Sequence, residues 1–507
     1  MGLCLWAATS PARAEWHRAS NGHFVIYADM PAKNLQAIAD RLERFDAAMR
    51  FIIKPEESRP VTIYVVPAED VGRLAGSRGV GGFYSPRTEE STIVTPARTA
   101  QHLDAYGFDA RTILQHEYAH HMLMGDLHEI LPSWANEGMA EFFGTADVKS
   151  DGRVLLGAPP RIRGFALLGN NRWTAREMLT SETRLIRPSE VAQRYARGWL
   201  LVHYLLLGGE RPGQYAQYIS AVSVGTPPGE AGEQVFGDLG KLNTDMQQHL
   251  RARSYRLLEL KKDQLAGAQP VTVEALSPGA AAITPYRVRS ATGVSREEAV
   301  ALADEAAPIA AHYFDDPFVQ RAYAEMLYDA HRYDDAIAAA DRALAVEPAN
   351  VMAMVYRGRA LARRWMAEGD LDLLRQARSW FLQANRADPN HPQPFVSYYD
   401  TFVSAGEAPN AAAQMGLLRA VVLAPQVASL RLRVGHLLLN EGDVEAARMM
   451  LAAVAFNPHT AEDNPARDAV RMMDEGKSAQ SIFAEVGARL LVSEFAEAAD
   501  DGGGDPT

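Results

Sequence analysis

The sequence predicts an α+β protein with a small mixed α/β sheet unit first, a helical domain next and an all-α region of helical repeats last. Three observations support this prediction. Strand-like and helical segments alternate over residues 15–100, apolar residues recur at helical spacing over residues 101–260, and a proline recurs at similar intervals after residue 340. The chain has 507 residues, more than one compact core usually spans, so several domains are expected.

The chain begins with MGLCLWAATSPARAEW. A short apolar run over residues 2–8 precedes Ala12-Arg13-Ala14, a small-residue pattern typical of the cleavage end of a secretory signal. We therefore interpret residues 1–14 as a signal peptide, truncated because its positively charged start is missing, and expect a periplasmic or secreted protein. The alternative is a cytoplasmic chain with an apolar start.

Charge and composition exclude several classes of function. The net charge is −12 and no Lys/Arg block occurs, so no nucleic-acid partner is expected, because phosphate binding needs clustered cations. No run of 18 apolar residues occurs, so no membrane span is expected. Cys4 is the only cysteine, so any metal must be held by His, Asp and Glu side chains.

The first unit, residues 15–100, alternates between strands and a helix. The segments HFVIYA (23–28) and PVTIYVV (60–66) read as strands, and residues 33–53 between them have apolar residues at helical spacing. A Gly-rich stretch, GVGGFY, reads as a loop, and a short strand follows over Thr92–Thr95.

The second unit, residues 101–260, reads as helical. One helix is expected over 109–124, with Asp109 as its N-cap, and another over 132–144, with a proline at its start. A third is expected over 191–209, ending at a pair of glycines. Residues 261–313 are less periodic and rich in Ala, Pro and Thr, so they are interpreted as a connector.

The last region, residues 314–495, contains a repeat. Four prolines stand 41, 36 and 33 residues apart, each five residues after an alanine, with a further alanine upstream. The prolines are Pro348, Pro389, Pro425 and Pro458, and the alanines are Ala336, Ala343, Ala377, Ala384, Ala413, Ala420, Ala446 and Ala453. This pattern resembles tetratricopeptide (TPR) repeats, units of 34 residues that form paired helices. The resemblance implies a surface for a protein partner; the alternative is a generic helical bundle. The tail, 496–507, is expected to be disordered.

The segment His116-Glu117-Tyr118-Ala119-His120 is an H-E-x-x-H motif. On a helix, positions i and i+4 share one face, so both imidazoles can reach one ion. Glu117 can then reach a water on that ion rather than the ion itself. The alternative is an ordinary helix with exposed histidines.

A second element, LPSWANEGMAEFF, places Glu137 17 residues beyond His120. The two elements together, H-E-x-x-H and W-x-N-E-G-x-A, resemble the gluzincin zinc metallopeptidases of the peptidase-MA-like group. The resemblance implies a thermolysin-like domain with one Zn²⁺ per chain, held by His116, His120 and Glu137, with Glu117 as the general base. It implies a peptide or protein substrate.

Two further site residues follow from the resemblance. Glu141 lies one turn after Glu137, where thermolysin-like relatives place a carboxylate that hydrogen-bonds the first histidine ligand. Tyr195 lies where gluzincins place a donor for the developing oxyanion. A solvated helix charge and a packing tyrosine are the respective alternatives. His121, His128 and His203 are expected to be structural or surface residues.

The strand at Ser91–Thr95 is expected to be the sheet edge along which such enzymes bind extended substrate. The Gly-x-Met-Glu-Asn motif of aminopeptidases in this clan is absent, which favours an endopeptidase. Two other functions stay open: a catalytically inactive peptidase-like TPR scaffold or adaptor, and a zinc hydrolase that acts on a non-peptide amide.

Overall fold

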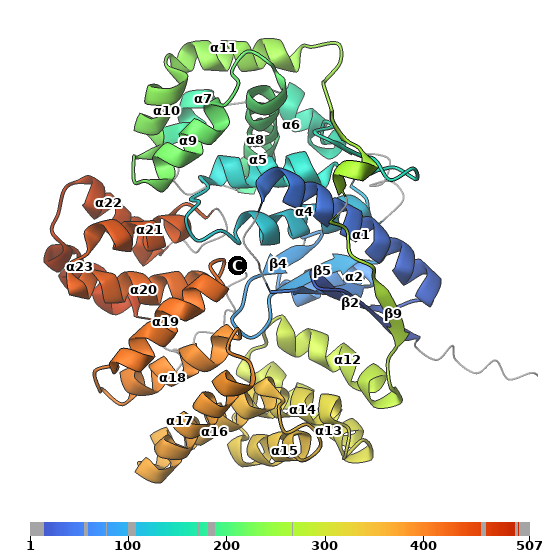
Figure 1. Ribbon diagram of the computed structural model, residues 1–507, viewed down its shortest axis with the longest axis vertical. Helices are drawn as coiled ribbons and strands as arrows, with labels where there is room; N and C mark the ends of the chain where they lie inside the picture. The colour runs from blue at the N-terminus through green and yellow to red at the C-terminus, as the bar shows by residue number, and fades with distance from the viewer. Residues whose placement is uncertain are drawn as a thin grey trace, which may run out of the picture.

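The computed structural model describes residues 15–54, 59–77, 79–99, 108–169, 173–180, 188–265, 267–457, 463–491 and 495. The predicted signal peptide, Pro458 and the predicted disordered tail lie outside these residues. Within the described part, no helix is both long and apolar enough to cross a bilayer. Figure 1 shows a sheet unit, a helical domain beside it, and an arc of helix pairs that curves from the sheet back to the helical domain.

The sheet unit is built on six strands in the order β4-β5-β3-β2-β1-β9. The strands are β1 (Trp16–Ser20), β2 (Phe24–Asp29), β3 (Val61–Val66), β4 (Phe83–Ser85), β5 (Thr92–Pro96) and β9 (Thr272–Ala275). β2, β3 and β5 are parallel, and β1, β4 and β9 are antiparallel to their neighbours. The three strands expected from the sequence are therefore present, and the sheet is mixed.

The edge of the sheet differs from the expectation. β5, which contains the expected edge residues, lies between β4 and β3, and all five of its residues are buried. The edge strand on this side of the sheet is β4. It is formed by Phe83–Ser85, at the end of the stretch interpreted as a loop. Three residues between glycines and a proline are too few for a strand pattern, so only the pairing with β5 reveals this strand.

Helices cover both faces of the sheet. α1 (Ala32–Ile53) and α4 (Ala110–Leu123) share one core with Ile26, Ile63 and Ile93. On the other face, Tyr27 and Tyr64 stack in register and pack with α2 (Ala68–Leu74) and α12 (Pro278–Ala291). α4, which carries the H-E-x-x-H motif, thus lies beside α1 in the helical layer on one face of the sheet.

The helical domain is centred on three helices, α4, α5 (Ser133–Gly144) and α8 (Pro188–Leu207). All three match the expected segments. The remaining elements are η1 (Arg161–Arg163), α6 (Gly164–Leu168), α7 (Ala175–Thr180), α9 (Gln214–Ser223), α10 (Pro228–Phe236), α11 (Leu239–Leu250) and a small sheet of β6 (Asp147–Val148), β7 (Val154–Leu156) and β8 (Leu258–Leu260).

The interpretation of residues 261–313 as a connector is wrong. This stretch holds η2 (Lys262–Leu265), the sheet strand β9, α12 and α13 (Arg296–His312). Pro285 and Pro308 lie inside α12 and α13, where a proline removes a helical hydrogen bond and normally signals a break. Tertiary packing overrides that local signal, since the buried sides of both helices join larger cores.

The repeat region is a series of helix pairs. They are α14 (Pro317–Asp329) with α15 (Tyr333–Val346), α16 (Val351–Glu368) with α17 (Leu371–Ala387), α18 (Pro392–Ser404) with α19 (Ala411–Leu423), α20 (Ala428–Glu441) with α21 (Val444–Ala455), and α22 (Pro465–Asp474) with α23 (Ala479–Leu490). Pro348, Pro389 and Pro425 each follow the end of a second helix, as expected.

The irregular spacing of the prolines has a structural cause. α16 has 18 residues and α17 has 17, against 13 and 14 in the preceding pair, which accounts for the 41-residue interval. The recurring alanines are fully buried in the first three units. In the fourth unit, Ala447 and Ala452 are buried instead, and Ala446 and Ala453 are only half-buried.

α12 and the repeats hold the sheet unit through the loop between β4 and β5. Within this loop, Glu90 pairs with Arg287 of α12 at 2.6 Å and Glu89 pairs with Arg359 of α16 at 2.9 Å. Thr88 also donates a hydrogen bond to Gln393 of α18. Burial alone would raise the pKa of both carboxyls, but the neighbouring arginines hold both pKa values below the usual range. The first helices of the pairs therefore face the sheet unit.

The Glu90→Gln variant tests this junction. Arg287 is only 4% exposed, so removing its carboxylate partner leaves a buried charge uncompensated. We expect the free energy of unfolding to fall by about 3 kcal/mol, measured by urea denaturation. Glu274→Gln removes a comparable but exposed pair with Arg18 and should cost under about 1 kcal/mol. Equal losses in the two variants would contradict the assigned role.

Candidate metal centre

The two histidines of the H-E-x-x-H motif lie on one face of α4. The Asp109 side chain caps this helix by accepting a hydrogen bond from the Thr112 backbone N–H at 2.8 Å, as expected. His116 and His120 are one turn apart, and their Nε2 atoms are 3.2 Å from each other. His120 is buried and His116 is half-buried, so the face they share looks into the domain rather than into solvent.

The carboxylate of Glu137 completes the cluster. Its Oε2 lies 3.6 Å from His116 Nε2 and 3.8 Å from His120 Nε2, and its side chain is fully buried. Three ligands about 2.1 Å from a tetrahedral Zn²⁺ lie about 3.4 Å from one another. The three atoms therefore have the spacing that one zinc ion requires, and two histidines with one glutamate are a donor set that zinc accepts.

The close approach of α5 and α8 depends on two glycines. A Cβ at Gly138 would lie 2.5 Å from the Gly198 carbonyl oxygen, and a Cβ at Gly198 would lie 2.8 Å from the Trp134 carbonyl oxygen. No larger side chain fits between the two backbones. The glycine of the N-E-G motif thus brings α8, with Tyr195, against the helix that carries Glu137.

Asn136, directly before Glu137, contacts the second histidine. Its Oδ1 lies 3.1 Å from His120 Nδ1, and both side chains are buried. If Nδ1 donates this hydrogen bond, the lone pair of Nε2 faces the metal position. In the sequence, Asn136 stands out only as part of the W-x-N-E-G-x-A motif. Its position directly before Glu137 was the available signal for its contact with His120.

Tyr118, inside the motif, anchors α4 to α1. Its hydroxyl donates a hydrogen bond to Asp46 Oδ1 at 2.7 Å, and Asp46 also pairs with Arg50 at 2.7 Å. The Tyr118 ring packs edge-on against Phe24 and Phe45. Tyr118, which stands between His116 and His120 in the sequence, therefore belongs to the core and holds α4 against α1.

Glu117 lies on the side of the site that faces the sheet edge. Its side chain is half-buried, and its Cγ would be 3.6 Å from a Cβ placed on Gly82. Gly82 directly precedes β4. Glu117 thus lies between the cluster of His116, His120 and Glu137 and the edge strand.

Tyr195 of α8 lies beside the same cluster. Its ring stacks on His116 with centroids 6.3 Å apart, and the Arg163 guanidinium lies over the ring at 5.1 Å from its centroid. Burial, the charge of Glu137 and a hydrogen bond to Glu137 raise the pKa of the Tyr195 hydroxyl well above its usual value. Tyr195 therefore keeps its proton and can act as a donor.

Glu141 makes a different contact from the one that the resemblance implies. Its Oε1 accepts hydrogen bonds from Arg163 Nε and Nη2, both at 2.8 Å, and among the described residues it makes no bond to His116. Burial raises the pKa of Glu141 and Arg163 offsets part of that effect. Arg163, which stands outside both motifs and had no sequence signal, thus links Glu141 to the Tyr195 ring.

Three further histidines, His121, His203 and His128, are structural or surface residues. His121 points away from the cluster to Tyr84, whose hydroxyl is 3.2 Å from its Nδ1, and burial lowers its pKa to about 4. His203 is buried against His249 and the Arg256 carbonyl. His128 is exposed. These placements agree with the expectation for all three.

A second group, His23, Glu43 and Asp46, also has metal-ligand spacing. Hydrogen bonds to both carboxylates raise the pKa of His23 to about 9, with Asp46 contributing most, so the imidazole is protonated at neutral pH. Asp46 is further occupied by Arg50 and Tyr118. This group therefore forms an ion-pair network that holds α1 to the sheet.

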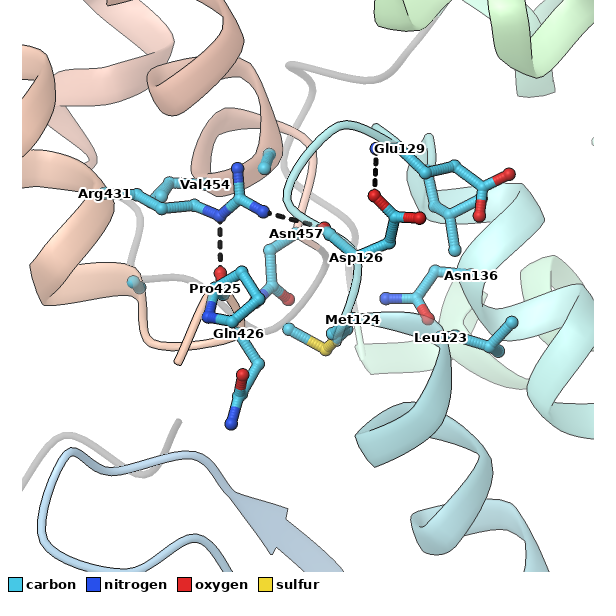
Figure 2. Close-up of a pocket in the computed structure, with 13 residues that line it drawn as sticks. Leu123, Met124, Asp126, Glu129, Asn136, Pro425, Gln426, Arg431, Val454 and Asn457 are labelled. Carbon is cyan, nitrogen blue, oxygen red and sulfur yellow. Dashed lines mark hydrogen bonds between the residues drawn. The ribbon is translucent and has the colours of Figure 1, made fainter. Parts of the chain in front are cut away.

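The loop between the two motifs is held by the repeats. Figure 2 shows Arg431 of α20 reaching the carbonyl oxygen of Asp126 at 3.1 Å, and it also bonds the Pro425 carbonyl at 2.5 Å. Arg431 is 4% exposed, and burial lowers its pKa to about 10. The adjoining pocket, which includes Asn136, has a volume of about 40 Å³, enough for only a few waters.

Two family models match parts of the chain. Residues 296–401 match a family described as Tetratricopeptide Repeats-Sensor, and residues 110–227 match DUF1570, described as a protein family of unknown function. The first match and the observed helix pairs together confirm a TPR-type region. The match begins at residue 296, inside the stretch 261–313 that was interpreted as a connector. The second spans both motifs and Tyr195. No curated protein matches the chain.

Solved TPR structures also resemble the chain. TTC0263, a thermophilic TPR protein of Thermus thermophilus, is 17% identical over 38% of this chain and 91% of its own, with a TM-score of 0.29. YrrB, a TPR protein with an unusual peptide-binding site, is 20% identical over 37% of this chain and 93% of its own, with a TM-score of 0.27.

The Asn136→Ala variant tests the outer contact to His120. We expect zinc affinity to fall roughly 10- to 100-fold, because His120 loses the group that orients its ring. A chelator competition titration measures this change. Asn34→Ala, at an exposed position of α1, is the control and should leave the affinity unchanged. Unchanged affinity in Asn136→Ala would exclude the proposed orientation.

Proposed function

We propose that this protein is a zinc-dependent metallopeptidase of the endopeptidase type. The observation that carries the proposal is the convergence of three ligand atoms from His116, His120 and Glu137 within 4.8 Å of one another. Glu117 stands beside this cluster and Tyr195 stacks against it. Together they supply the ligand set, the base and the donor that hydrolysis of an amide requires.

When bound, zinc would polarise the substrate carbonyl and make a water more acidic. Glu117 would accept a proton from the attacking water and later pass it to the leaving amine. The Tyr195 hydroxyl, which keeps its proton because its pKa is raised, would donate a hydrogen bond to the oxygen that becomes negative. Arg163 and Glu141 would hold the Tyr195 ring in place.

The edge strand β4 supports an extended peptide as substrate. Among the described residues β4 pairs with β5 alone, so a further strand could pair with its other side. Glu117 lies close to Gly82, at the start of this strand, so a peptide paired with β4 would run past the base. The absence of the aminopeptidase motif favours cleavage within a chain, and export from the cytoplasm stays a prediction from the sequence.

The TPR-type region suggests protein partners, so a second function is an inactive peptidase-like scaffold. The two proposals differ in one property. A scaffold does not need a metal or a base, whereas the peptidase needs both. The chain brings the three candidate metal ligands and Glu117 close together, which favours the peptidase. A zinc hydrolase acting on a non-peptide amide would use the same residues and differ only in substrate.

Metal content distinguishes the peptidase from the scaffold. We expect about one zinc per wild-type chain and almost none in the His116→Ala/His120→Ala variant, measured by elemental mass spectrometry after zinc is offered. His128→Ala removes an exposed histidine from the loop between the motifs and should keep the metal. A folded wild-type chain that binds no zinc would favour the scaffold.

Glu117→Gln separates binding from catalysis. A neutral amide cannot accept the water's proton, so we expect unchanged zinc content and a loss of peptide turnover of at least about 100-fold. Cleavage of a casein or quenched-peptide substrate measures the rate. Glu69→Gln, at an exposed position of α2, is the control. A variant that cleaves at the wild-type rate would exclude Glu117 as the base.

A further inference from the structure

Phe495 lies far from the helix that precedes it in the chain. α23 ends at Leu490 and packs with α20 and α22. Phe495 instead belongs to a cluster formed by α16 and α17, three helix pairs back along the arc. Its side chain is completely buried. The ring is therefore not part of the stacking of its own pair, and it fills a site that other repeats provide.

The site receives Phe495 through both its ring and its backbone. The ring shares a cluster with Leu361 and Ala362 of α16 and with Leu373, Ala377 and Phe381 of α17. Arg363 Nη1 donates a hydrogen bond to the Phe495 carbonyl oxygen at 2.9 Å, and the Arg363 guanidinium carbon lies 5.8 Å from the centroid of the ring. One arginine thus recognises an aromatic ring and the adjacent carbonyl together.

Arg363 is held in place independently of Phe495. Its Nε donates a hydrogen bond to the Tyr328 hydroxyl of α14 at 3.3 Å. One turn earlier on α16, Arg359 pairs with Glu89 of the β4–β5 loop. α16 therefore holds two segments that are not part of the helix pairs: the β4–β5 loop, through Glu89, and the segment that contains Phe495. A guanidinium fixed in advance loses less freedom when a ligand binds.

The charges around the site indicate what else would bind. α16 carries four arginines, at 357, 359, 363 and 364. In the sequence, Phe495 is flanked by acidic residues in the segment SEFAE. Arg357, Arg359 and Arg364 already pair with other carboxylates. Arg363, which contacts Phe495, is the charge that favours an acidic segment over a basic one.

We propose that α16 and α17 form a docking site for an aromatic residue in an acidic peptide segment, and that Phe495 occupies this site in cis. A partner protein that presents such a segment would bind by displacing Phe495. The proposal concerns the repeats alone and does not rest on the metal centre, so its failure would leave the proposed peptidase untouched.

A labelled peptide tests the competition. The probe is fluorescein-LVSEFAEAAD, residues 491–500, titrated against the full-length protein by fluorescence anisotropy. We expect Phe495→Ala to bind at least tenfold more tightly than the wild type, because the resident ring no longer competes. Adding Arg363→Ala to Phe495→Ala should weaken binding at least tenfold. Equal affinities of wild type and Phe495→Ala would overturn the proposal.

Two controls define the site. Phe314→Ala removes an exposed ring that also lies beside an arginine, Arg342, and should bind the peptide as the wild type does. A peptide with alanine in place of its phenylalanine should not bind to Phe495→Ala. Binding of that peptide with undiminished affinity would show that the aromatic ring is not the anchor, and would overturn the proposal.

A second measurement avoids any loss of packing. 4-Fluorophenylalanine is placed at position 495 of the otherwise unchanged protein, and its fluorine resonance is followed while unlabelled peptide is added. We expect the buried resonance to be replaced by one at the position of the unfolded protein. If the peptide binds and the buried resonance stays, the peptide occupies another site and the proposal is wrong.

Discussion

The candidate site depends on the close packing of α4, α5 and α8, because its ligand atoms come from helices that are not continuous in the chain. His116 and His120 are set by one helix, but Glu137 reaches them only if α5 lies against α4. Gly138 and Gly198 then let α8 approach α5 without a side chain between their backbones. A side chain at that crossing would separate Tyr195 from the carboxylate that it contacts.

The outer contacts of the site convert this packing into a fixed arrangement of polar groups. Asn136 orients His120, Tyr118 ties α4 to Asp46, and Arg163 joins Glu141 to the Tyr195 ring. Each of these groups is buried or half-buried, so the charges and hydrogen bonds act with little competition from water. The proposed catalysis depends on such an arrangement of polar groups.

The TPR-type region is built into the rest of the molecule rather than attached by a flexible linker. α16 holds the β4–β5 loop through Glu89, and Arg431 of α20 holds the loop between the two motifs. α12, which precedes the helix pairs, holds the same β4–β5 loop through Glu90. Both contacts border the candidate site, one at the edge strand and one between the ligand-bearing helices. A partner that moved the repeats would therefore act on the edge strand and on the helices of the candidate site together.

The sequence by itself determined the helices that carry the two motifs, the N-cap Asp109, the proposed ligand set and the existence of TPR-type repeats. The helices and the cap follow from local periodicity and capping, which one segment expresses alone. The ligand set and the repeats are what the resemblance of local motifs to known families implies. The tertiary structure decided the rest: the edge role of Phe83–Ser85, the joining of β9 to the sheet, the pairing of Glu141 with Arg163, and the burial of Phe495 against α16. Each depends on residues far apart in the chain, because strand pairing and ion pairing are set by packing and leave no local pattern.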